Sequence, residues 1–270
     1  MTFIKQYGPW SVITGASSGI GAQYARVLAL MGLNVVIVAR RKSKLNTLAS
    51  FITSATTAEV KVVVADLSCT EGLLKLESET SGLDVGLLVN NAGQEHSGRF
   101  LDSSLDDAKS TIALNCQAPM QLTHHYAQQM KQKRRGGIIL MSSLVAYQGV
   151  PFVSNYAGTK AYNLIFGESI AAELQQHNID VLISTPGFTA TELAADWSFA
   201  DVPIKPLDPS FVARTTIDAL GKKRVVIPGA VNKFLYLGSK YLQTRKLSTF
   251  LFKFVFTRVL YAKLDGENNA

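Results

Sequence analysis

The sequence predicts an α/β protein in which helices flank a doubly wound parallel sheet. Short apolar segments alternate with longer stretches of helical character along the first 230 residues, as expected for successive strand–helix units. A glycine-rich turn directly follows the first apolar segment. No internal repeat and no linker divides the 270 residues. We therefore expect one large domain, since α/β sheets can exceed the usual domain size.

Composition narrows the class of protein further. The two cysteines, Cys69 and Cys116, stand in no ligand-spaced cluster, which favours reduced thiols and no structural metal. His124 and His125 are neighbours in a helical stretch, so they should point to different faces rather than share a metal ion. The first residues lack a secretory pattern, and no uncharged apolar run reaches the roughly 18 residues of a spanning helix. We expect a cytoplasmic protein.

The strands and helices follow from the same alternation. Strands are expected at residues 11–14, 34–39, 60–65, 85–89, 137–141, 180–184 and 224–227, with residues 60–65 forming a buried strand. Helices are expected from the glycine-rich turn to Leu30, around Tyr156, and at residues 68–81, 104–133 and 208–220. Residues 190–209 contain prolines and large apolar side chains. We interpret this segment, from about residue 188 to 209, as a substrate lid.

The glycine-rich turn indicates a dinucleotide site. A strand, such a turn and a helix in succession bring the backbone close to a pyrophosphate, and the helix N-terminus supplies free N–H groups. The spacing here is G-x-x-x-G-x-G and not the older G-x-G-x-x-G. We expect cofactor contacts from Gly15, Ser17, Ser18, Gly19, Ile20 and Gly21.

The end of the second strand favours NADP(H) over NAD(H). In NAD-binding sheets an acid often ends this strand, about 20 residues after the glycines. Here Ala39 stands 18 residues after Gly21, and Arg40-Arg41-Lys42 follows. An Arg can hold a 2′-phosphate through two parallel hydrogen bonds, so we assign Arg40 to the cofactor. The alternative is a solvated basic turn.

Polar and small residues follow two other strands, at the edge where open α/β sheets bind ligands. Asp66 ends the third strand, where it could meet the adenine or cap the next helix. Asn115 lies inside the expected helix 104–133, an unfavourable place that suggests a local role, although an exposed Asn is the commoner case. Pro119 predicts a kink just after it. The cofactor residues expected from these strand ends are Asp66, Leu67, Asn91, Ala92 and Gly93.

Tyr156 and Lys160 are spaced to act together. Residues four apart share one face of a helix, and an ammonium group lowers the pKa of a neighbouring phenol from its usual value of about 10. Such a phenol can give a proton to a carbonyl oxygen and take one from an alcohol. Ser143, at the end of the fifth strand, faces the same crevice. The alternative for any Tyr/Lys pair is solvated helix surface.

Together these motifs resemble the classical branch of the short-chain dehydrogenase/reductase family. The resemblance covers about residues 8–230 in the family's order and spacing. It departs from the family at Gly158-Thr159, where Ala-Ser is frequent, and in a longer tail after Gly229. The matching motifs are Thr14-Gly-Ala-Ser-Ser-Gly-Ile-Gly21, Asn90-Asn-Ala-Gly93, Asn115, Ser143, Tyr156-x-x-x-Lys160 and Pro186-Gly187 with Thr191.

The resemblance implies a seven-stranded Rossmann-type sheet and a role for each matched residue. Tyr156 would be the general acid in reduction and the general base in oxidation. Ser143 would hydrogen-bond the substrate oxygen. Lys160 would lower the pKa of Tyr156 and hold the nicotinamide ribose, and Asn115 would position a water in a proton relay to Lys160. Family members form dimers or tetramers. Further cofactor contacts are expected from Tyr156, Lys160, Pro186, Gly187, Thr189 and Thr191.

The sequence thus predicts an NADP(H)-dependent oxidoreductase that acts as a carbonyl reductase on an apolar substrate, such as a 3-oxoacyl chain, a steroid or a retinoid. One alternative is a dehydrogenase of a small alcohol or sugar. Another is a dinucleotide-binding regulator without turnover, although the complete set of four catalytic residues argues against it. The basic run at residues 131–135 lies at a helix C-terminus, where cations are stabilising, so no nucleic-acid partner is expected.

The tail carries the positive charge of the whole chain. We expect a catalytic domain at residues 1–230 and a basic amphipathic extension at residues 231–270. Between Ala219 and Leu264 there are ten basic residues and no acid, whereas the rest has 17 basic and 20 acidic residues. Lys253 makes the extension a poor spanning helix. It could lie on an anionic membrane surface, pack on the sheet or a partner subunit with its lysines reaching outward, or bind an acidic protein.

Overall fold

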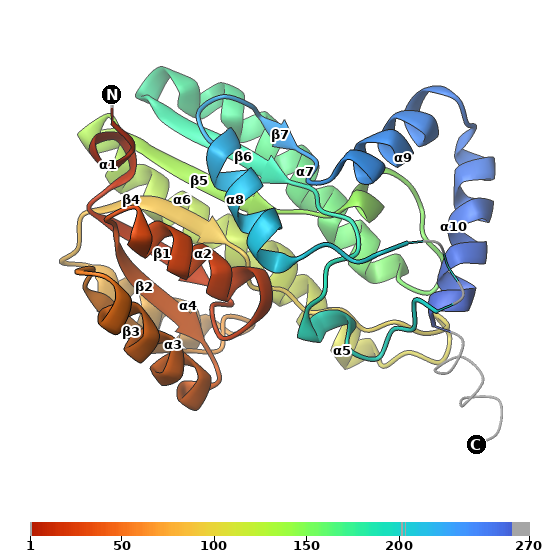
Figure 1. Cartoon of the computed structure of the whole chain (residues 1–270), viewed down its shortest axis with the longest axis horizontal. Helices are drawn as coiled ribbons and strands as arrows, with labels where there is room; N and C mark the ends of the chain where they lie inside the picture. Colours follow the sequence, from red (N-terminus) through yellow and green to blue (C-terminus); the bar gives the residue numbers. More distant parts are fainter. Residues whose placement is uncertain (1, 201, 203, 261–270) are drawn as a thin grey trace.

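Seven strands form one parallel sheet in a computed structural model that describes residues 2–200, 202 and 204–260. They are β1 (Trp10–Thr14), β2 (Asn34–Ala39), β3 (Val60–Val64), β4 (Val85–Asn90), β5 (Gly136–Met141), β6 (Ile179–Ser184) and β7 (Val225–Val226). Their order is β3-β2-β1-β4-β5-β6-β7 (Figure 1), so the direction of winding reverses between β1 and β4. The predicted doubly wound, seven-stranded Rossmann-type sheet is confirmed.

Helices cover both faces of the sheet. One face carries α2 (Gly19–Leu30), α3 (Lys42–Ala55) and α8 (Pro209–Ala219), and the other carries α4 (Thr70–Thr80), α6 (Ala118–Lys133) and α7 (Ser154–Leu174). Alternate side chains of the buried strands enter the two layers: Ile13 packs in the first and Val12 in the second. A short helix that the sequence did not predict, α1 (Phe3–Tyr7), precedes β1.

Strand β3 is not the buried strand that the sequence suggested. It lies at the edge of the sheet and has a single neighbour, β2. Of its five residues only Val63 is fully buried. Lys61 lies within the strand, and its ammonium group is 2.9 Å from the carboxylate of Glu79 on α4. An edge strand is covered less completely than a central one, which is why a lysine is accommodated here.

The single helix expected at residues 104–133 is interrupted. The structure has α5 (Leu105–Ile112), a π-helical segment (Ala113–Gln117) and then α6. Pro119 has no N–H to donate to the carbonyl of Asn115, four residues earlier, and its ring would clash with that carbonyl in a regular helix. The wider turn separates the two groups. Asn163 on α7 donates its Nδ2 to the carbonyl of Asn115 at 2.9 Å, so this carbonyl is satisfied from outside the helix.

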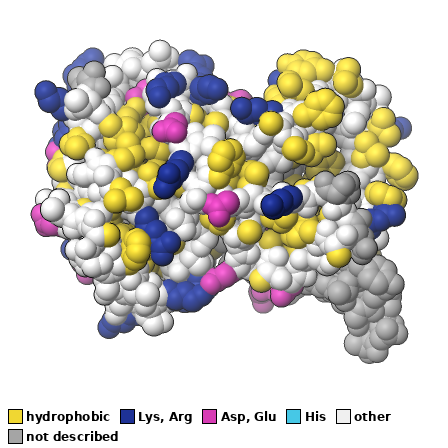
Figure 2. All heavy atoms as spheres, viewed as in Figure 1, with side chains coloured by type: hydrophobic (Ala, Val, Ile, Leu, Met, Phe, Trp, Pro, Cys, Tyr) yellow, Lys and Arg dark blue, Asp and Glu magenta, His cyan; other side chains and the backbone are white. Residues whose placement is uncertain are grey.

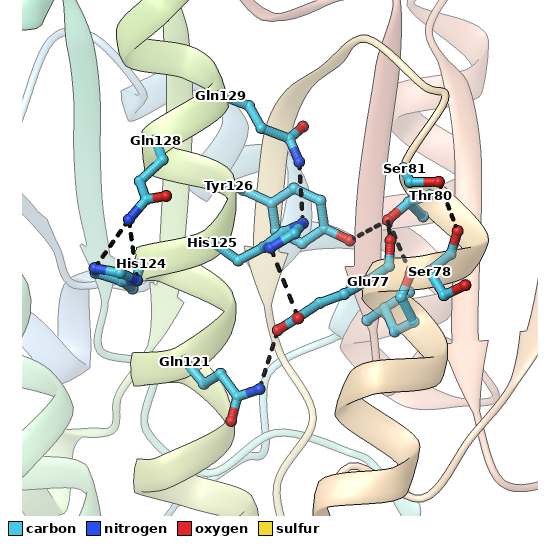
Figure 3. Close-up of polar contacts among 11 residues, drawn as sticks. Glu77, Ser78, Thr80, Ser81, Gln121, His124, His125, Tyr126, Gln128 and Gln129 are labelled. Carbon is cyan, nitrogen blue, oxygen red and sulfur yellow. Dashed lines mark hydrogen bonds and ion pairs between the residues drawn. The ribbon is translucent and has the colours of Figure 1, made fainter.

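The two neighbouring histidines contribute to the surface of α6 and to its packing against α4 (Figure 3). His125 faces α4, with its Nδ1 3.7 Å from the carboxylate of Glu77. Next to it, the hydroxyl groups of Tyr126 and Thr80 are 2.8 Å apart and buried. His124 points away from this contact, as expected for adjacent helical positions. These polar contacts hold the two helices together.

The basic run at residues 131–135 also has a structural role. Lys133 and Arg135 both bind Asp84, which directly precedes β4, with N–O distances of 2.6 and 2.5 Å. Arg134 ends α6 in a left-handed conformation. The C-terminus of α6 is thereby held to the sheet.

The lid segment and the extension lie beyond the last strands. The lid leaves the sheet after β6 and is closed at its base by a bridge between Thr189 and Leu207. The extension forms two helices, α9 (Ala230–Tyr241) and α10 (Arg245–Val259), at the end of the molecule opposite α3 (Figure 1). Phe256 and Leu260 are buried among apolar residues of the loop that leads into α7. In the part of the chain that the structure describes, no helix is long and apolar enough to cross a bilayer.

Candidate active site

A cleft of about 310 Å³ runs along the carboxyl ends of the strands, across the point where the winding reverses. Ligands bind at this place in open α/β sheets. The cleft gathers the residues that the sequence predicted: every predicted site residue except Gly21 and Asn115 lines it. The sequence did not assign several others that also line it, namely Arg41, Val145, Val153, Phe188, Glu192, Leu193, Trp197, Phe252 and Phe256.

The glycine-rich turn is packed so closely against β4 that side chains do not fit. Gly15 has a φ of +68°, and a Cβ placed on it would lie 2.8 Å from Cα of Ala92. A Cβ on Gly21 would lie 2.3 Å from the carbonyl oxygen of Gly15. Ser18 precedes the first turn of α2, whose N-terminal residues line the cleft. The bare backbone and the helix N-terminus together suit a pyrophosphate, so a dinucleotide fits this half of the cleft.

A threonine hydroxyl joins the ends of β1 and β4. The Thr14 hydroxyl donates to the carbonyl of Val89 at 3.3 Å and accepts from the backbone N–H groups of Asn91 and Ala92 at 3.0 and 2.9 Å. The side chain of Asn91 returns a bond to the carbonyl of Thr14 at 2.9 Å. These bonds explain why Thr14 and Asn91 belong to the motifs around the turn: they fix the floor of the cleft.

The acidic residue expected near the adenine does not cap a helix. Oδ1 of Asp66 accepts from the N–H and the hydroxyl of Ser68, at 3.0 and 2.7 Å, and so forms a turn before α4. Cys69 is the residue that precedes the first turn of α4. Arg40 lies with one guanidinium nitrogen 3.7 Å from the other Asp66 oxygen, and its side chain is 64% exposed. The Arg40 side chain is therefore accessible to a ligand in the cleft, and its one ion pair, with Asp66, is long.

Arg41 makes the contacts that the sequence did not foresee. Its guanidinium group donates to the hydroxyl groups of Ser17 and Ser18 in the glycine-rich turn, at 2.7 and 2.8 Å. It also binds Glu192 of the lid at 2.5 Å, and Lys44 of α3 binds the same carboxylate. Arg41 was visible in the sequence as part of a basic run. Glu192 was not, because it comes from a loop 151 positions away.

Tyr156 and Lys160 lie at the start of α7, and Ser143 lies at the end of β5, as predicted. The ammonium group of Lys160 is 5.4 Å from the centre of the Tyr156 ring. It donates to the carbonyl of Met141 at 2.9 Å, and the side chain is buried. The Ser143 hydroxyl donates to the carbonyl of Pro186 and accepts from the N–H of Val145, both at 3.4 Å, and it lies close enough to Tyr156 to lower the pKa of that phenol. Three polar groups therefore meet on one wall of the cleft.

The pKa of Tyr156 is shifted in the direction opposite to the one expected. Burial raises this pKa, the nearby Glu95 carboxylate raises it further, and the neighbouring Ser143 hydroxyl lowers it. Lys160 does not reverse the shift: its ammonium group donates to the Met141 carbonyl and lies 5.4 Å from the centre of the Tyr156 ring. Burial lowers the pKa of Lys160 to about 8. The raised pKa keeps the Tyr156 phenol protonated at neutral pH.

Asn115 is buried in the π-helical segment and holds a loop in place. Its Oδ1 accepts from the N–H of Gln94 at 2.9 Å, and its Nδ2 donates to the Gln94 carbonyl at 2.9 Å and to the Thr159 hydroxyl at 3.1 Å. A Cβ on Gly93 would lie 3.3 Å from Asn115 Oδ1 and 3.4 Å from Lys160 Nζ. Asn115 and Lys160 thus converge on one backbone position. The proton relay through a water stays a prediction.

The other half of the cleft is apolar and largely aromatic. Phe188 and Trp197 of the lid segment and Phe256 of α10 form a cluster with ring centres 5.5 to 5.8 Å apart. The charged side chains that line the cleft are Arg40, Arg41, Asp66, Lys160 and Glu192; none of them belongs to this cluster. Sequence analysis interpreted the segment that contains Trp197 as a substrate lid but assigned none of these rings to the site. It also did not place α10 at the cleft, although Phe252 and Phe256 stand four apart, a spacing that shares one helix face.

Comparison with known proteins identifies the family. The family model for short chain dehydrogenases matches residues 9–201. The chain belongs to the short-chain dehydrogenase family. It is therefore an oxidoreductase that depends on a nicotinamide dinucleotide, and the family resemblance noted from the motifs is confirmed.

Relatives within the family are similar over most of the chain. It is 31% identical to the 7β-hydroxysteroid dehydrogenase of Clostridium sardiniense, over 86% of this chain and 90% of that protein. It is 36% identical to the very-long-chain 3-oxoacyl-CoA reductase of Podospora anserina, over 64% of this chain. That match spans only 53% of the reductase, about half its length.

Solved structures agree with this assignment. A structure from a study of 7β-hydroxysteroid dehydrogenase stereoselectivity has a TM-score of 0.86 at 29% identity, covering 93% of this chain and 99% of that one. A short-chain dehydrogenase from Sphingobium yanoikuyae in complex with NADPH has a TM-score of 0.75 at 30% identity, covering 82% and 87%.

Replacing Lys160 by Met should change how folding stability depends on pH. The pKa of Lys160 is about 8 in the folded protein against a reference value of 10.5. The unfolded chain therefore binds more protons between these values. The electrostatic cost of burying Lys160 is complete below about pH 8 and fades as the pH rises toward 10.5. From pH 7 to pH 9.5 the wild-type free energy of unfolding should gain about 2 kcal/mol relative to Lys160→Met.

Urea unfolding of both proteins without cofactor at the two pH values measures this difference. Lys75→Met is a matched control, because Lys75 also donates to a backbone carbonyl, that of Val64, but is exposed. It should show no such change relative to the wild type. An equal pH dependence in wild type and Lys160→Met would contradict the lowered pKa.

Proposed function

We propose that this short-chain dehydrogenase interconverts a carbonyl and a secondary alcohol on an apolar substrate, with NADP(H) as cofactor and Tyr156 as general acid and base. The observation that carries the proposal is the placement of Tyr156. Its hydroxyl lies beside that of Ser143 in a cleft with a glycine-lined half, suited to a dinucleotide, and an aromatic half. A carbonyl group entering from the aromatic side meets both hydroxyl groups.

The proton chemistry follows from this placement. In reduction, Tyr156 donates its proton to the substrate oxygen while Ser143 donates a hydrogen bond to the same oxygen, on which negative charge develops. The nicotinamide, when bound, supplies hydride transfer. The raised pKa keeps Tyr156 protonated, as an acid must be. In oxidation the Tyr156 phenolate takes the proton back.

The aromatic half of the cleft supports an apolar substrate. Phe188, Trp197 and Phe256 offer no charged partner to a ligand. The relatives named above are a 7β-hydroxysteroid dehydrogenase and a very-long-chain 3-oxoacyl-CoA reductase. Their names support a steroid or a 3-oxoacyl chain for this protein, and a retinoid has the same apolar character. A small alcohol or sugar would require polar side chains in this half of the cleft. A regulator without turnover would not require the grouping of Asn115, Ser143, Tyr156 and Lys160.

The end of β2 supports NADP(H) as the cofactor. Ala39 lines the cleft where an acid would otherwise hold a ribose hydroxyl. Arg40 and Arg41 line the cleft next to Ala39, and Lys44 binds the same carboxylate as Arg41; such cations suit a 2′-phosphate. The NADPH complex of the Sphingobium yanoikuyae relative agrees with this choice.

Replacing Tyr156 by Phe should lower the rate of turnover by at least about 100-fold, because the variant lacks only the proton donor. NADPH binding, measured by the fluorescence of the reduced cofactor, should stay close to that of wild type. Tyr162→Phe is the matched control, since Tyr162 lies exposed on the same helix. If the Tyr156→Phe variant keeps more than about a tenth of the rate, an effect below ~1.4 kcal/mol, Tyr156 is not the acid.

The variant Ala39→Asp with Arg40→Ser should shift binding from NADPH toward NADH. The new carboxylate repels a 2′-phosphate and accepts a hydrogen bond from a 2′-hydroxyl. The ratio of the two dissociation constants should change by at least about 10-fold. Titration of both cofactors against both proteins measures it. A wild-type protein that binds NADH more tightly than NADPH would refute the proposed cofactor before any substitution is made.

We further propose that residues 1–230 form the catalytic domain, with a lid at residues 188–209, and that the extension rests on an anionic membrane surface that supplies apolar substrate. One face of α10 lines the cleft with Phe252 and Phe256, while Phe250 and Phe254 are 64% and 54% exposed. Figure 2 shows apolar side chains gathered over α9 and α10. The surrounding charges are basic. Residues 261–270 of the extension lie outside the described structure.

Liposome cosedimentation tests the membrane proposal. Binding should rise with the fraction of anionic lipid and fall with added salt, which screens exposed charges. The variant Phe250→Ser with Phe254→Ser should bind at least about 10-fold less, because two exposed rings no longer enter the bilayer. The matched control is Leu30→Ser with Phe211→Ser, two exposed residues of α2 and α8. If wild-type protein remains in the supernatant at low salt, the membrane proposal is wrong and the extension packs on the protein instead.

A homo-oligomer is a separate proposal. Ile112 of α5 and Ile165 of α7 are apolar and exposed, 42% and 61% respectively. These two helices contact each other. A second copy of the chain placed on them would cover both side chains.

A further inference from the structure

Glu192 of the lid is bound by two cations: Arg41, which lines the nucleotide half of the cleft, and Lys44 of α3. Its carboxylate accepts from Arg41 at 2.5 Å and from the ammonium group of Lys44. The same Arg41 donates to the hydroxyl groups of Ser17 and Ser18. Hydrogen bonds from Lys44 and Arg41 lower the pKa of Glu192 to about 2, so its carboxylate is ionised at neutral pH.

These partners form an anion site. Two cations, one of them a guanidinium group, and two hydroxyl groups are the donors that commonly hold a phosphate. Arg41, Ser17 and Ser18 line the cleft together with Ala39, where the absence of an acid leaves room for a 2′-phosphate. In the structure the occupant of this site is a carboxylate of the chain itself. We call Ser17, Ser18, Arg41 and Lys44 the anion site.

Glu192 also ties the lid to the turn that receives the cofactor. It begins a short 3-10 helix, Glu192–Ala194. Just before it, Thr191 lies against Gly19 of the glycine-rich turn, since a Cβ on Gly19 would be 3.0 Å from Thr191 Cγ2. Just after it, Leu193 and Trp197 line the cleft. An ion pair at Glu192 therefore holds this part of the lid over the nucleotide half.

We propose that Glu192 is a built-in competitor of the cofactor's 2′-phosphate. In the free enzyme its carboxylate occupies the anion site; the phosphate of NADP(H) displaces it and releases the lid segment. The inference rests on the proposed use of NADP(H). It adds a residue that sets cofactor affinity and a coupling between phosphate recognition and lid position. A dinucleotide without the phosphate leaves the contact in place, so the coupling distinguishes the two cofactors.

Binding titrations with Glu192→Gln test the competition. The variant keeps the shape of the side chain and removes its charge. It should bind NADPH about 3- to 10-fold more tightly than wild type, the range expected when exposed ion pairs are lost. Binding of NADH should change by less than about 2-fold. Unchanged or weaker binding of NADPH, or an equal gain for both cofactors, would overturn the proposal.

Two small probes separate the anion site from the rest of the cofactor. Adenosine 2′,5′-bisphosphate carries the 2′-phosphate, and 5′-AMP lacks it. Glu192→Gln should strengthen binding of the first by the same factor and leave the second unchanged. The control is Asp196→Asn, because Asp196 is an exposed acid in the same segment and none of the ion pairs among the described residues includes it. It should alter neither probe. An equal gain from Asp196→Asn would show a general charge effect and overturn the proposal.

The same titrations keep the two proposals apart. Wild-type protein that prefers NADPH, with no effect of Glu192→Gln, would refute the competitor and leave the proposed cofactor intact. If wild-type protein does not bind NADPH more tightly than NADH, the proposed use of NADP(H) is refuted. In that case the titration with adenosine 2′,5′-bisphosphate would still test whether Glu192 competes with a 2′-phosphate for the anion site.

Trp197 offers a direct report on the lid. The chain has two tryptophans, Trp10 and Trp197, so Trp10→Phe leaves the lid residue as the sole one. Adenosine 2′,5′-bisphosphate should shift its emission and 5′-AMP should not. The added substitution Glu192→Gln should produce the shifted emission without ligand. Emission that is insensitive to the bisphosphate would overturn the release of the lid.

Discussion

The contact of the glycine-rich turn with the end of β4 is the constraint on which the rest of the site depends. Gly15 and Gly21 leave no space for a Cβ, and the Thr14 hydroxyl fastens β1 to the backbone that follows β4. This contact puts the N-terminus of α2 at the point where the winding of the sheet reverses. The carboxyl ends of β4, β5 and β6 then form the opposite wall, and α7 presents Tyr156 from that wall.

Local sequence patterns predicted the features that depend on residues close together in the chain. Alternation of apolar and helical segments gave the seven strands, and Ala39 was correctly placed at the end of β2. Most of the site residues are predictable for the same reason, because they follow a strand or lie in the first turns of a helix; Asn115 is an exception. The wide turn at Asn115 was foreseen only as a kink. Its shape depends on Pro119 together with a donor, Asn163, that arrives from another helix.

The sequence could not predict what depends on tertiary contacts. The shift in the pKa of Tyr156 is governed by burial and by Glu95, neither of which follows from the four-residue spacing to Lys160. Glu192 meets Arg41 across 151 positions, a distance that no local pattern reports. The exposure of β3 follows from its place at the sheet edge, which periodicity does not reveal. That α10 forms a wall of the cleft could not be predicted, because it depends on how the chain reverses between α9 and α10.

The π-helical segment also sets the rotational phase of α5 relative to α6. A π turn contains one residue more than a regular turn, and each residue advances a helix by about 100°. Loss of one residue between Ala113 and Gln117 would therefore swing α5 by roughly that angle about its axis. Thr111, now 1% exposed, would turn toward solvent, and the loop held by Asn115 would lose its anchor. At this place the length of the chain, as well as its side chains, determines the geometry of the site.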